Sequence, residues 1–161
     1  MFQFTVGFLK ADPKARYQGY TFYFREGFCW SAVNGTRSTN ELKFRFKQKS
    51  VTDVQGMSLY CVAYSVSAKY ITCICNADFI SRYTESFINS TVIFQINDAR
   101  QIPVIIPFAE QMNEFEELFD FATKIKKAHL SNQISESETE KKLAEIQNSL
   151  GKMVDELYGI V

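Results

Sequence analysis

The C-terminal third of the chain contains two stretches of helical periodicity separated by a short break, and no other feature constrains the fold as strongly. In the first stretch, apolar residues recur every three or four positions, at Phe108, Met112, Phe115, Phe119, Ala122 and Ile125. This spacing places them on one face of a helix. Glutamates lie near the start of the stretch and lysines near its end, which is the arrangement that the helix dipole favours.

The second stretch begins where "HLSNQIS" interrupts the first pattern. Ser135, followed three residues later by Glu138, predicts a capping box at a helix N-terminus. The apolar residues that follow have the spacing of a coiled-coil seam, at Leu143, Ile146, Leu150, Met153 and Leu157. Two helices of about 20 residues joined by a short loop are expected to form an antiparallel hairpin roughly 30 Å long.

The preceding part of the chain mixes strand and helix signals. Segments rich in aromatic and β-branched residues predict strands over 17–25, 41–50 and 56–66. Two helices are expected next, over 67–75 and 76–87, and Ser67 and Asn76 are their candidate N-caps. The predicted fold class is therefore α+β: a small, twisted, mainly antiparallel sheet with packed helices, followed by the helical hairpin.

The segment "FQINDARQIPVIIP" joins these two parts. Its "NDAR" portion is expected to form a turn. Pro103 and Pro107 fit neither a helix interior nor a central strand. We therefore predict a short edge or terminal strand over 104–107, with Pro107 in the first turn of the long helix. This divides the chain into a body, residues 1–107, and a hairpin, residues 108–161.

Charge is distributed unevenly between the two parts, although the net charge is zero. Residues 1–108 contain 12 basic and 7 acidic residues, a balance of +5. Residues 109–161 contain 6 basic and 11 acidic residues, a balance of −5. A basic globular part followed by an acidic helical part indicates that the basic part binds a polyanion.

Targeting signals and cysteine usage favour the cytoplasm. The chain has no run of about 18 apolar residues, so no membrane span is expected. The start "MFQFTVGFLKADPK" lacks the basic, apolar and small-residue regions of a signal peptide. Cys29, Cys61, Cys73 and Cys75 lie in aromatic or apolar stretches, which suits reduced thiols better than a disulfide framework.

Signatures of catalysis, metal binding and cofactor binding are not found in the sequence. Neither a phosphate-binding G-x-x-x-x-G-K-[ST] loop nor a G-x-G-x-x-G motif occurs. The single histidine, His129, is expected in the last turn of the first long helix, away from any nucleophile. Cys73 and Cys75 have no second pair at zinc spacing and are expected in the core. We therefore expect a chain that binds without catalysis of its own.

Candidate binding residues gather between positions 30 and 49. The sole tryptophan, Trp30, lies in "FCWSAVNGTRSTN", which is interpreted as a polar loop that also carries Asn34 and Arg37. The next segment alternates apolar with basic residues, so one strand face is expected to carry Lys43, Arg45, Lys47 and Lys49. Clustered cations beside amides and hydroxyls can hold phosphates and contact base edges. A solvated edge strand, on which lysines prevent aggregation, explains the same spacing.

Several short segments of the sequence, in their order along the chain, resemble the TaqI-like C-terminal specificity domain of adenine DNA methyltransferases and fused restriction–methylation enzymes. In that family an Asn-Ser-type pair leads into a helix, a turn, a strand of "IPIPIP" character and a long helix. Asn76-Ala77 and "QIPVIIP" stand in the corresponding places, and "VDELYG" resembles the family's closing "VYELYGL". Upstream, "GFCWSAVNGTRS" and "KQKSVTDVQGMSLY" resemble its tryptophan loop and a strand pair. The likeness spans roughly residues 20–161.

The chain departs from this family in the catalytic region. The family's Asn-Pro-Pro-Tyr-type tetrapeptide and S-adenosylmethionine site are missing, since the only prolines are Pro13, Pro103 and Pro107. The resemblance therefore implies a recognition module without its catalyst, either a separately encoded specificity protein or part of a longer enzyme.

The function implied by the resemblance is sequence-specific recognition of double-stranded DNA in a restriction–modification system. The basic strand and tryptophan loop would contact DNA, and a methyltransferase or nuclease domain or subunit would be the partner. The hairpin would be a spacer or docking arm, or it would pack on the body and cover an edge. The alternative is a protein-interaction module that forms a dimer or heteromer through the hairpin.

Overall fold

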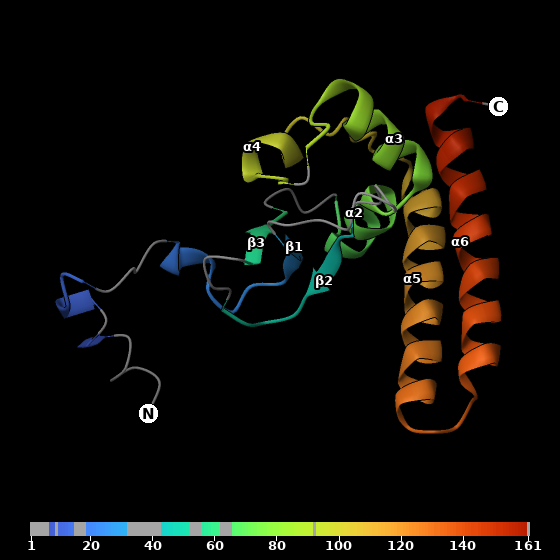
Figure 1. Cartoon of the computed structure of the whole chain (residues 1–161), viewed down its shortest axis with the longest axis horizontal. Coiled ribbons are helices and arrows are strands. Elements are labelled where there is room, and N and C mark those ends of the chain that lie inside the picture. The colour runs from blue at the N-terminus through green and yellow to red at the C-terminus, as the bar shows by residue number, and fades with distance from the viewer. Residues whose placement is uncertain are drawn as a thin grey trace.

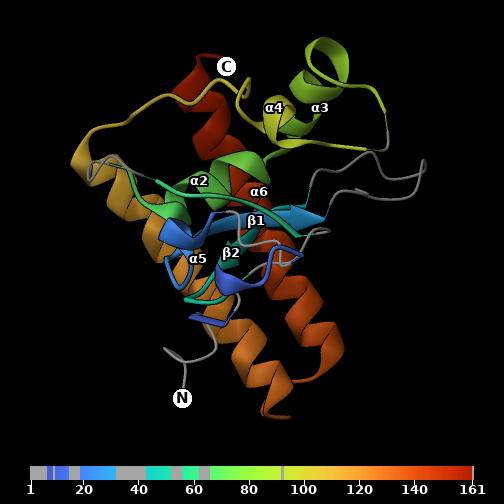
Figure 2. The ribbon, with the colours of Figure 1, turned by 90° about the vertical axis from the view of Figure 1, so that its left-hand side faces the viewer.

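The computed structural model describes residues 7–8, 10–14, 19–31, 43–51, 56–61, 66–91 and 93–160. Within these residues the chain forms a three-stranded antiparallel sheet, a group of shorter helices and a long helical hairpin, so the predicted α+β class is confirmed (Figure 1). Helix α2 (Ala68–Cys75) contacts the sheet on one side and the hairpin on the other. Figure 2 shows the sheet in front of the hairpin.

The sheet has the strand order β2-β1-β3, and its central strand is the one that the sequence analysis missed. Strand β1 (Gly27–Ser31) pairs with β2 (Arg45–Lys47) and with β3 (Gly56–Leu59), both in antiparallel orientation. The second and third predicted strands are thus found in shortened form. The strand predicted over 17–25 is wrong for the described residues, where Tyr20–Phe22 form a short 3-10 helix, η1.

Trp30 lies on β1 and not in a polar loop, which corrects the interpretation of the tryptophan segment. Its side chain is 2% exposed and contacts the rings of Phe44 and Phe94, with centroids 5.4 and 5.9 Å away. The indole Nε1 donates a hydrogen bond of 3.0 Å to the backbone oxygen of Phe94. A buried indole needs such a partner for its N–H, so Trp30 is a core residue that anchors the sheet to the segment just before helix α4 (Ile96–Ala99).

The N-terminal caps of the shorter helices confirm one prediction and correct another. Ser67 Oγ accepts a hydrogen bond of 3.1 Å from the backbone nitrogen of Tyr70 and caps α2, as predicted. Helix α3 (Asp78–Phe87) begins after Ala77, and Asn76 is not its N-cap. The Asn76 side chain bonds instead to the strand segment before β2 and to α2. The predicted "NDAR" turn is a one-turn helix, α4 (Ile96–Ala99), with its own capping box.

The segment 103–108 connects α4 to the hairpin without forming the predicted strand. Its two prolines remove backbone donors, and side chains bind two of its carbonyl groups. The hydroxyl of Tyr70 donates to the oxygen of Ile105, and the hydroxyl of Tyr158 donates to the oxygen of Pro103. Pro107 precedes the N-cap residue Phe108 and therefore lies just before the first turn, not in it.

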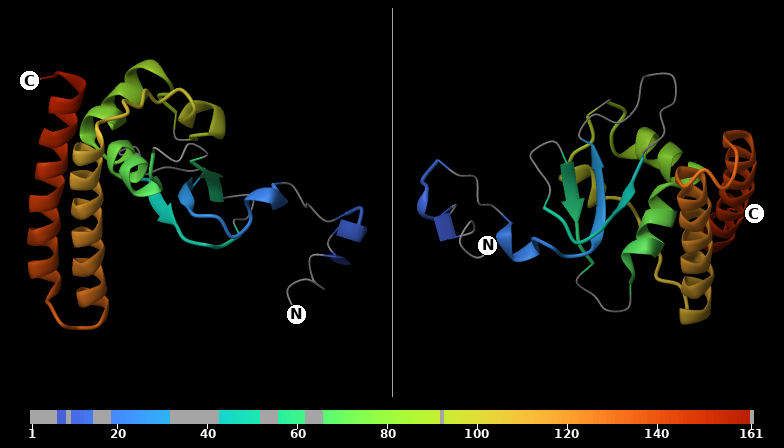
Figure 3. Two further views of the ribbon diagram at one scale, coloured as in Figure 1. Left: turned by 180° about the vertical axis from the view of Figure 1, so that it is seen from behind. Right: turned by 90° about the horizontal axis from the view of Figure 1, so that it is seen from below.

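The hairpin matches its prediction closely. Helix α5 (Ala109–Leu130) and helix α6 (Glu136–Tyr158) lie side by side, and the loop between them extends beyond the sheet (Figure 3). Ser135 Oγ caps α6 through the nitrogen of Glu138. The cap at Ser135 is the half of the predicted capping box that the structure shows, and the Glu138 carboxylate pairs with Lys142 at 2.7 Å. No helix in the described part of the chain combines the length and apolar character needed to cross a bilayer.

One hydrophobic core runs through the sheet, α2 and the hairpin. It contains Phe28 and Trp30 of β1 and Phe44 just before β2, together with Tyr70 and Ile74 of α2. It continues through Met112 and Phe115 of α5 and through Leu150 and Val154 of α6. The buried residues of the hairpin near the sheet therefore belong to the same core as the strands.

Candidate functional site

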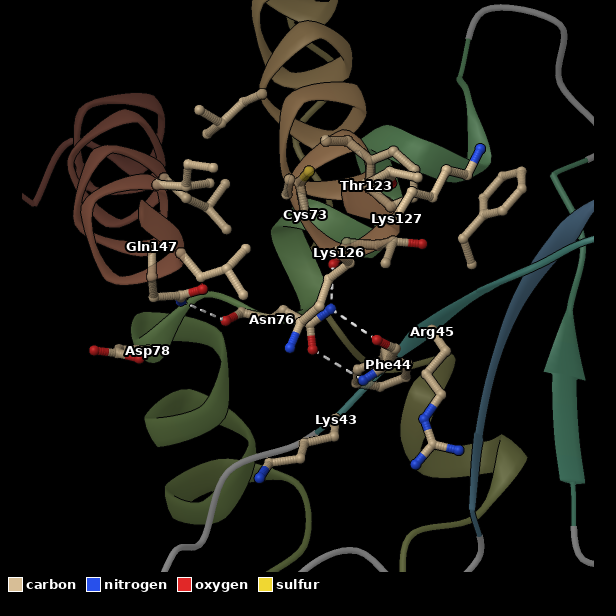
Figure 4. Close-up of a pocket in the computed structure, with 18 of the residues that line it drawn as sticks. Lys43, Phe44, Arg45, Cys73, Asn76, Asp78, Thr123, Lys126, Lys127 and Gln147 are labelled. Carbon is tan, nitrogen blue, oxygen red and sulfur yellow. Dashed lines mark hydrogen bonds between the residues drawn. The ribbon is translucent and has the colours of Figure 1, made fainter. Parts of the chain in front are cut away.

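A pocket of about 830 Å³ lies where the sheet, α2 and the hairpin meet. Its walls are the segment Lys43–Phe46, the end of α2, the start of α3, and the loop-proximal parts of α5 and α6 (Figure 4). Most of its interior is apolar, with Phe44, Phe119, Ala122, Leu143, Ile146 and Leu150 among the lining residues. A concave, mainly apolar site of this size falls in the range of small-molecule pockets, about 300–1,000 Å³.

Basic side chains dominate the charged part of the pocket lining. Of the lining residues that the structure describes, four are basic and one is acidic: Lys43, Arg45, Lys126, Lys127 and Asp78. All five are exposed. Within the described ranges, Arg45, Lys126 and Lys127 have no ion-pair partner. We call Lys43, Arg45, Lys126 and Lys127 the cationic rim.

Asn76 fixes the position of the strand segment that carries half of this rim. Its Oδ1 accepts a hydrogen bond of 2.9 Å from the nitrogen of Phe44, and its Nδ2 donates one of 2.9 Å to the oxygen of Phe44. Nδ2 also donates to the oxygen of Thr72 at 2.8 Å, and Gln147 Nε2 donates to the oxygen of Asn76 at 3.1 Å (Figure 4). Asn76 thus ties the backbone between Lys43 and Arg45 to both α2 and α6.

Two of the residues predicted to contact DNA have buried side chains. Trp30 lies in the core, as described above. Lys47 is 3% exposed, and its Nζ donates to the backbone oxygens of Arg25, Gln48 and Ser50 at 3.1, 3.3 and 2.5 Å. An ammonium with three carbonyl partners has no donor left for a phosphate, because it has three N–H groups.

The pairing of β1 with β2 explains why Lys47 is buried. Lys47 pairs with Gly27, and a Cβ on Gly27 would lie 2.9 Å from the ring of Tyr60. The absent side chain leaves room first for the backbone oxygen of Leu59 on β3 and then for this ring. The Lys47 ammonium lies 5.3 Å from the ring centroid. The alternation predicted for 43–49 holds at Lys43, Phe44 and Arg45 and ends at Lys47.

The remaining predicted site residues fall into three groups. Lys43 and Arg45 line the pocket. Lys49 is exposed but is not one of its lining residues. Asn34 and Arg37 lie outside the described residues. The sequence analysis missed Lys126 and Lys127 as site residues, because it attributed these lysines to the helix dipole alone. Two adjacent lysines on the end of a helix were the available signal, and only the fold places them opposite Arg45.

The surroundings of the pocket's thiol favour its neutral form. Cys73 lines the pocket, and its Sγ donates to the oxygen of Phe115 at 3.6 Å. Burial, and then the nearby carboxylates of Glu116 and Asp120, raise the pKa of Cys73 to about 12. Burial also raises the pKa of Cys75 to about 12. Both thiols are free and buried, which confirms the prediction that they belong to the core. Among the described residues, no cluster of three or more His, Cys, Asp or Glu side chains is arranged to hold a metal.

Comparison of the chain with family models, with curated proteins and with solved structures gave no match. Functional inference therefore depends on the chemistry of the pocket and its rim. That chemistry is an apolar interior beside a group of exposed cations.

Proposed function

We propose that this chain is a cytoplasmic DNA-binding specificity module that serves a methyltransferase or nuclease partner. One observation carries the proposal. Lys43 and Arg45, on the strand segment, share one pocket with Lys126 and Lys127, at the end of α5. Lysine and arginine side chains gathered at one place can contact phosphate oxygens. The resemblance to specificity domains adds the expectation that the polyanion is duplex DNA.

The pairing of nearby carboxylates supports this proposal. Asp120 of α5 pairs with Lys69 at 2.7 Å, and Glu138 of α6 pairs with Lys142 at 2.7 Å. These acids are thus neutralised by lysines outside the rim. Arg45 adds a guanidinium, which can hold a phosphate or the edge of guanine with two hydrogen bonds. Asn76 holds the Arg45 backbone in place through Phe44.

The test is fluorescence anisotropy with a pool of random duplexes at several salt concentrations. We expect binding that weakens with salt, because cations that contact phosphates release counterions. Replacing Arg45 and Lys126 by glutamine should weaken binding and reduce the slope of log affinity against log salt by about 0.9 per lost contact. Lys124→Gln is the matched control, because Lys124 is exposed on the same helix and is not a lining residue.

Two results would overturn the proposal. One is the absence of duplex binding by the wild-type chain at low salt. The other is a loss of binding per removed charge that is equal in the rim variant, which lacks two cations, and in Lys124→Gln, which lacks one, since the cations would then act only through overall charge. A preferred sequence selected from the pool would identify the DNA target.

A second candidate function is protein–protein docking through the outer surface of α5. Phe121 is 54% exposed there, although the other phenylalanines of this helix are at least partly buried. An exposed large aromatic side chain is a common anchor at protein interfaces. Sedimentation velocity over a range of concentrations tests this function. Concentration-dependent association that Phe121→Ser abolishes, without a change in DNA binding, would support it.

A further inference from the structure

The apolar interior of the pocket has no role in phosphate binding. Cations at a surface are sufficient for contacts to a phosphate backbone. This pocket has in addition a volume of about 830 Å³ lined by aromatic and aliphatic side chains. Pockets of this size and composition are typical of sites for small molecules. The interior therefore points to a ligand with an apolar body.

The apolar surface inside the pocket comes from the hairpin half that the sheet does not cover. Leu143 and Ile146 of α6 and Ala122 of α5 are half-buried, and all three face the pocket. Leu130, also a lining residue, is 80% exposed. Phe44 forms the opposite wall on the strand segment, and the ring of Phe46 contacts the ring of Phe119 of α5, with centroids 5.5 Å apart. An apolar chain lying between these walls would remove apolar surface from water on both sides, which favours binding.

The polar groups of the pocket indicate the charge of the polar end of the ligand. The Asn76 side chain lines the pocket, but its amide already bonds to Phe44 and Thr72. Charged recognition is therefore provided by the cationic rim, with Asp78 as the only carboxylate among the described lining residues. Figure 4 shows Asp78 beside Gln147, on the opposite side of the pocket from Arg45. An anionic group would thus be favoured on the Arg45 side.

We propose that this pocket binds a single-chain anionic amphiphile, with its carboxylate at Arg45 and Lys126 and its acyl chain in the apolar interior. The chain would lie between Phe44 on one side and Ala122 and Ile146 on the other, and the Phe46–Phe119 ring contact would close one end of its site. This inference goes beyond DNA recognition and does not depend on it, because the occupant is a small molecule and its binding is measured without DNA. Since both ligands use Arg45 and Lys126, the amphiphile would displace DNA if both bind.

The test is isothermal titration calorimetry of the full chain with hexanoate, octanoate, decanoate and dodecanoate, each kept below its micelle concentration. Each added methylene should tighten binding about fourfold until the pocket is full, because it transfers apolar surface from water to the interior. The matched primary alcohols should bind at least about tenfold more weakly than the carboxylates, because they lack the charge-assisted hydrogen bonds.

Variants separate the two parts of the site. Arg45→Gln with Lys126→Gln should remove the preference for carboxylate over alcohol and keep the dependence on chain length. Ala122→Leu should weaken binding of both series, because the added atoms occupy the interior. Lys124→Gln should bind like the wild type. Circular dichroism confirms that each variant is folded, and the chain-length series on the wild type remains informative even if Ala122→Leu is unstable.

Three results would overturn the proposal. The first is the absence of binding by any chain length. The second is equal affinity for carboxylates and alcohols, which would assign no role to the rim. The third is binding only to vesicles of anionic phospholipid and not to the monomeric carboxylates, which would indicate a membrane surface. Failure of DNA binding would leave this inference intact, because none of these measurements includes DNA.

Discussion

The two halves of the α5–α6 hairpin have the same apolar periodicity and different surroundings. Near the sheet, Met112, Phe115, Leu150 and Val154 are buried in the common core. Toward the loop, Ile125 and Thr139 are the buried residues. The other apolar side chains of this half line the pocket or are exposed to solvent. The comparison teaches that periodicity determines which face of a helix is apolar, whereas the fold determines whether that face becomes core or binding surface.

The largest expected effect is the difference between two phenylalanines of α5. Phe115 is 2% exposed and packs in the core, and Phe121 is 54% exposed. Phe115→Ala should reduce the free energy of unfolding by about 3–5 kcal/mol, because it leaves a cavity. Phe121→Ala should change it by less than about 0.5 kcal/mol. Urea denaturation followed by circular dichroism measures both, and similar values for the two variants would contradict the difference in burial between the core face and the outer face of α5.

High pH should destabilise mainly the part of the molecule near the sheet. Burial raises the pKa values of Tyr70, Cys73, Cys75 and Tyr158, all of which lie in α2 or at the end of α6. For Cys75 the pKa rises from 9.0 to about 12. The fold thus favours the neutral thiol, so this stabilisation is complete below pH 9 and is lost as pH rises toward 12.

At pH 11 this one thiol should lower the free energy of unfolding by about 2–3 kcal/mol relative to neutral pH. Urea denaturation between pH 8 and pH 11 provides the measurement. The variant Cys75→Ala should show a flatter dependence on pH, since it removes the titrating group. An unchanged dependence in this variant would show that other groups cause the alkaline loss of stability.

The smallest of these effects is expected at Asn76, which joins the strand segment before β2 to α2 and α6. Asn76→Ala should lower the free energy of unfolding by about 1–3 kcal/mol, because it leaves the N–H and the carbonyl of Phe44 without their partner. Gln147→Ala removes one exposed hydrogen bond to the same asparagine and should cost less. Thermal unfolding of both variants tests this order. Equal effects would mean that the Asn76 side chain does not hold the strand segment.

The hairpin could be predicted from the sequence because its signals are local. Apolar spacing of three and four residues, together with the cap at Ser135, located both helices to within a few residues. The central strand could not be predicted in this way. Phe28 and Trp30 are buried, and Cys29 between them is half-buried, so β1 lacks the clear alternation that marks a strand with one face in water. Its polar neighbours in sequence then led to the interpretation as a loop.

The candidate site was predictable only in part. The alternation around Phe44 correctly indicated that Lys43 and Arg45 are exposed. The burial of Lys47 depends on its pairing with Gly27, and strand register between distant segments is a tertiary property. The approach of Lys126 to the strand segment likewise depends on how the hairpin packs on α2. The cationic rim was identified from the fold, and the resemblance to specificity domains stays a prediction.

The burial of Lys47 has a practical consequence for chemical footprinting. An amine reagent must reach a lone pair on the side-chain nitrogen, and this nitrogen is enclosed by three carbonyl groups and an aromatic ring. Lys47 should therefore stay unlabelled in the native chain and become labelled only when the sheet opens. The exposed Lys126 and Lys127 should be labelled at once and be protected by any occupant of the pocket. A single labelling experiment read by mass spectrometry would thus contain its own reporter of unfolding beside its reporters of occupancy.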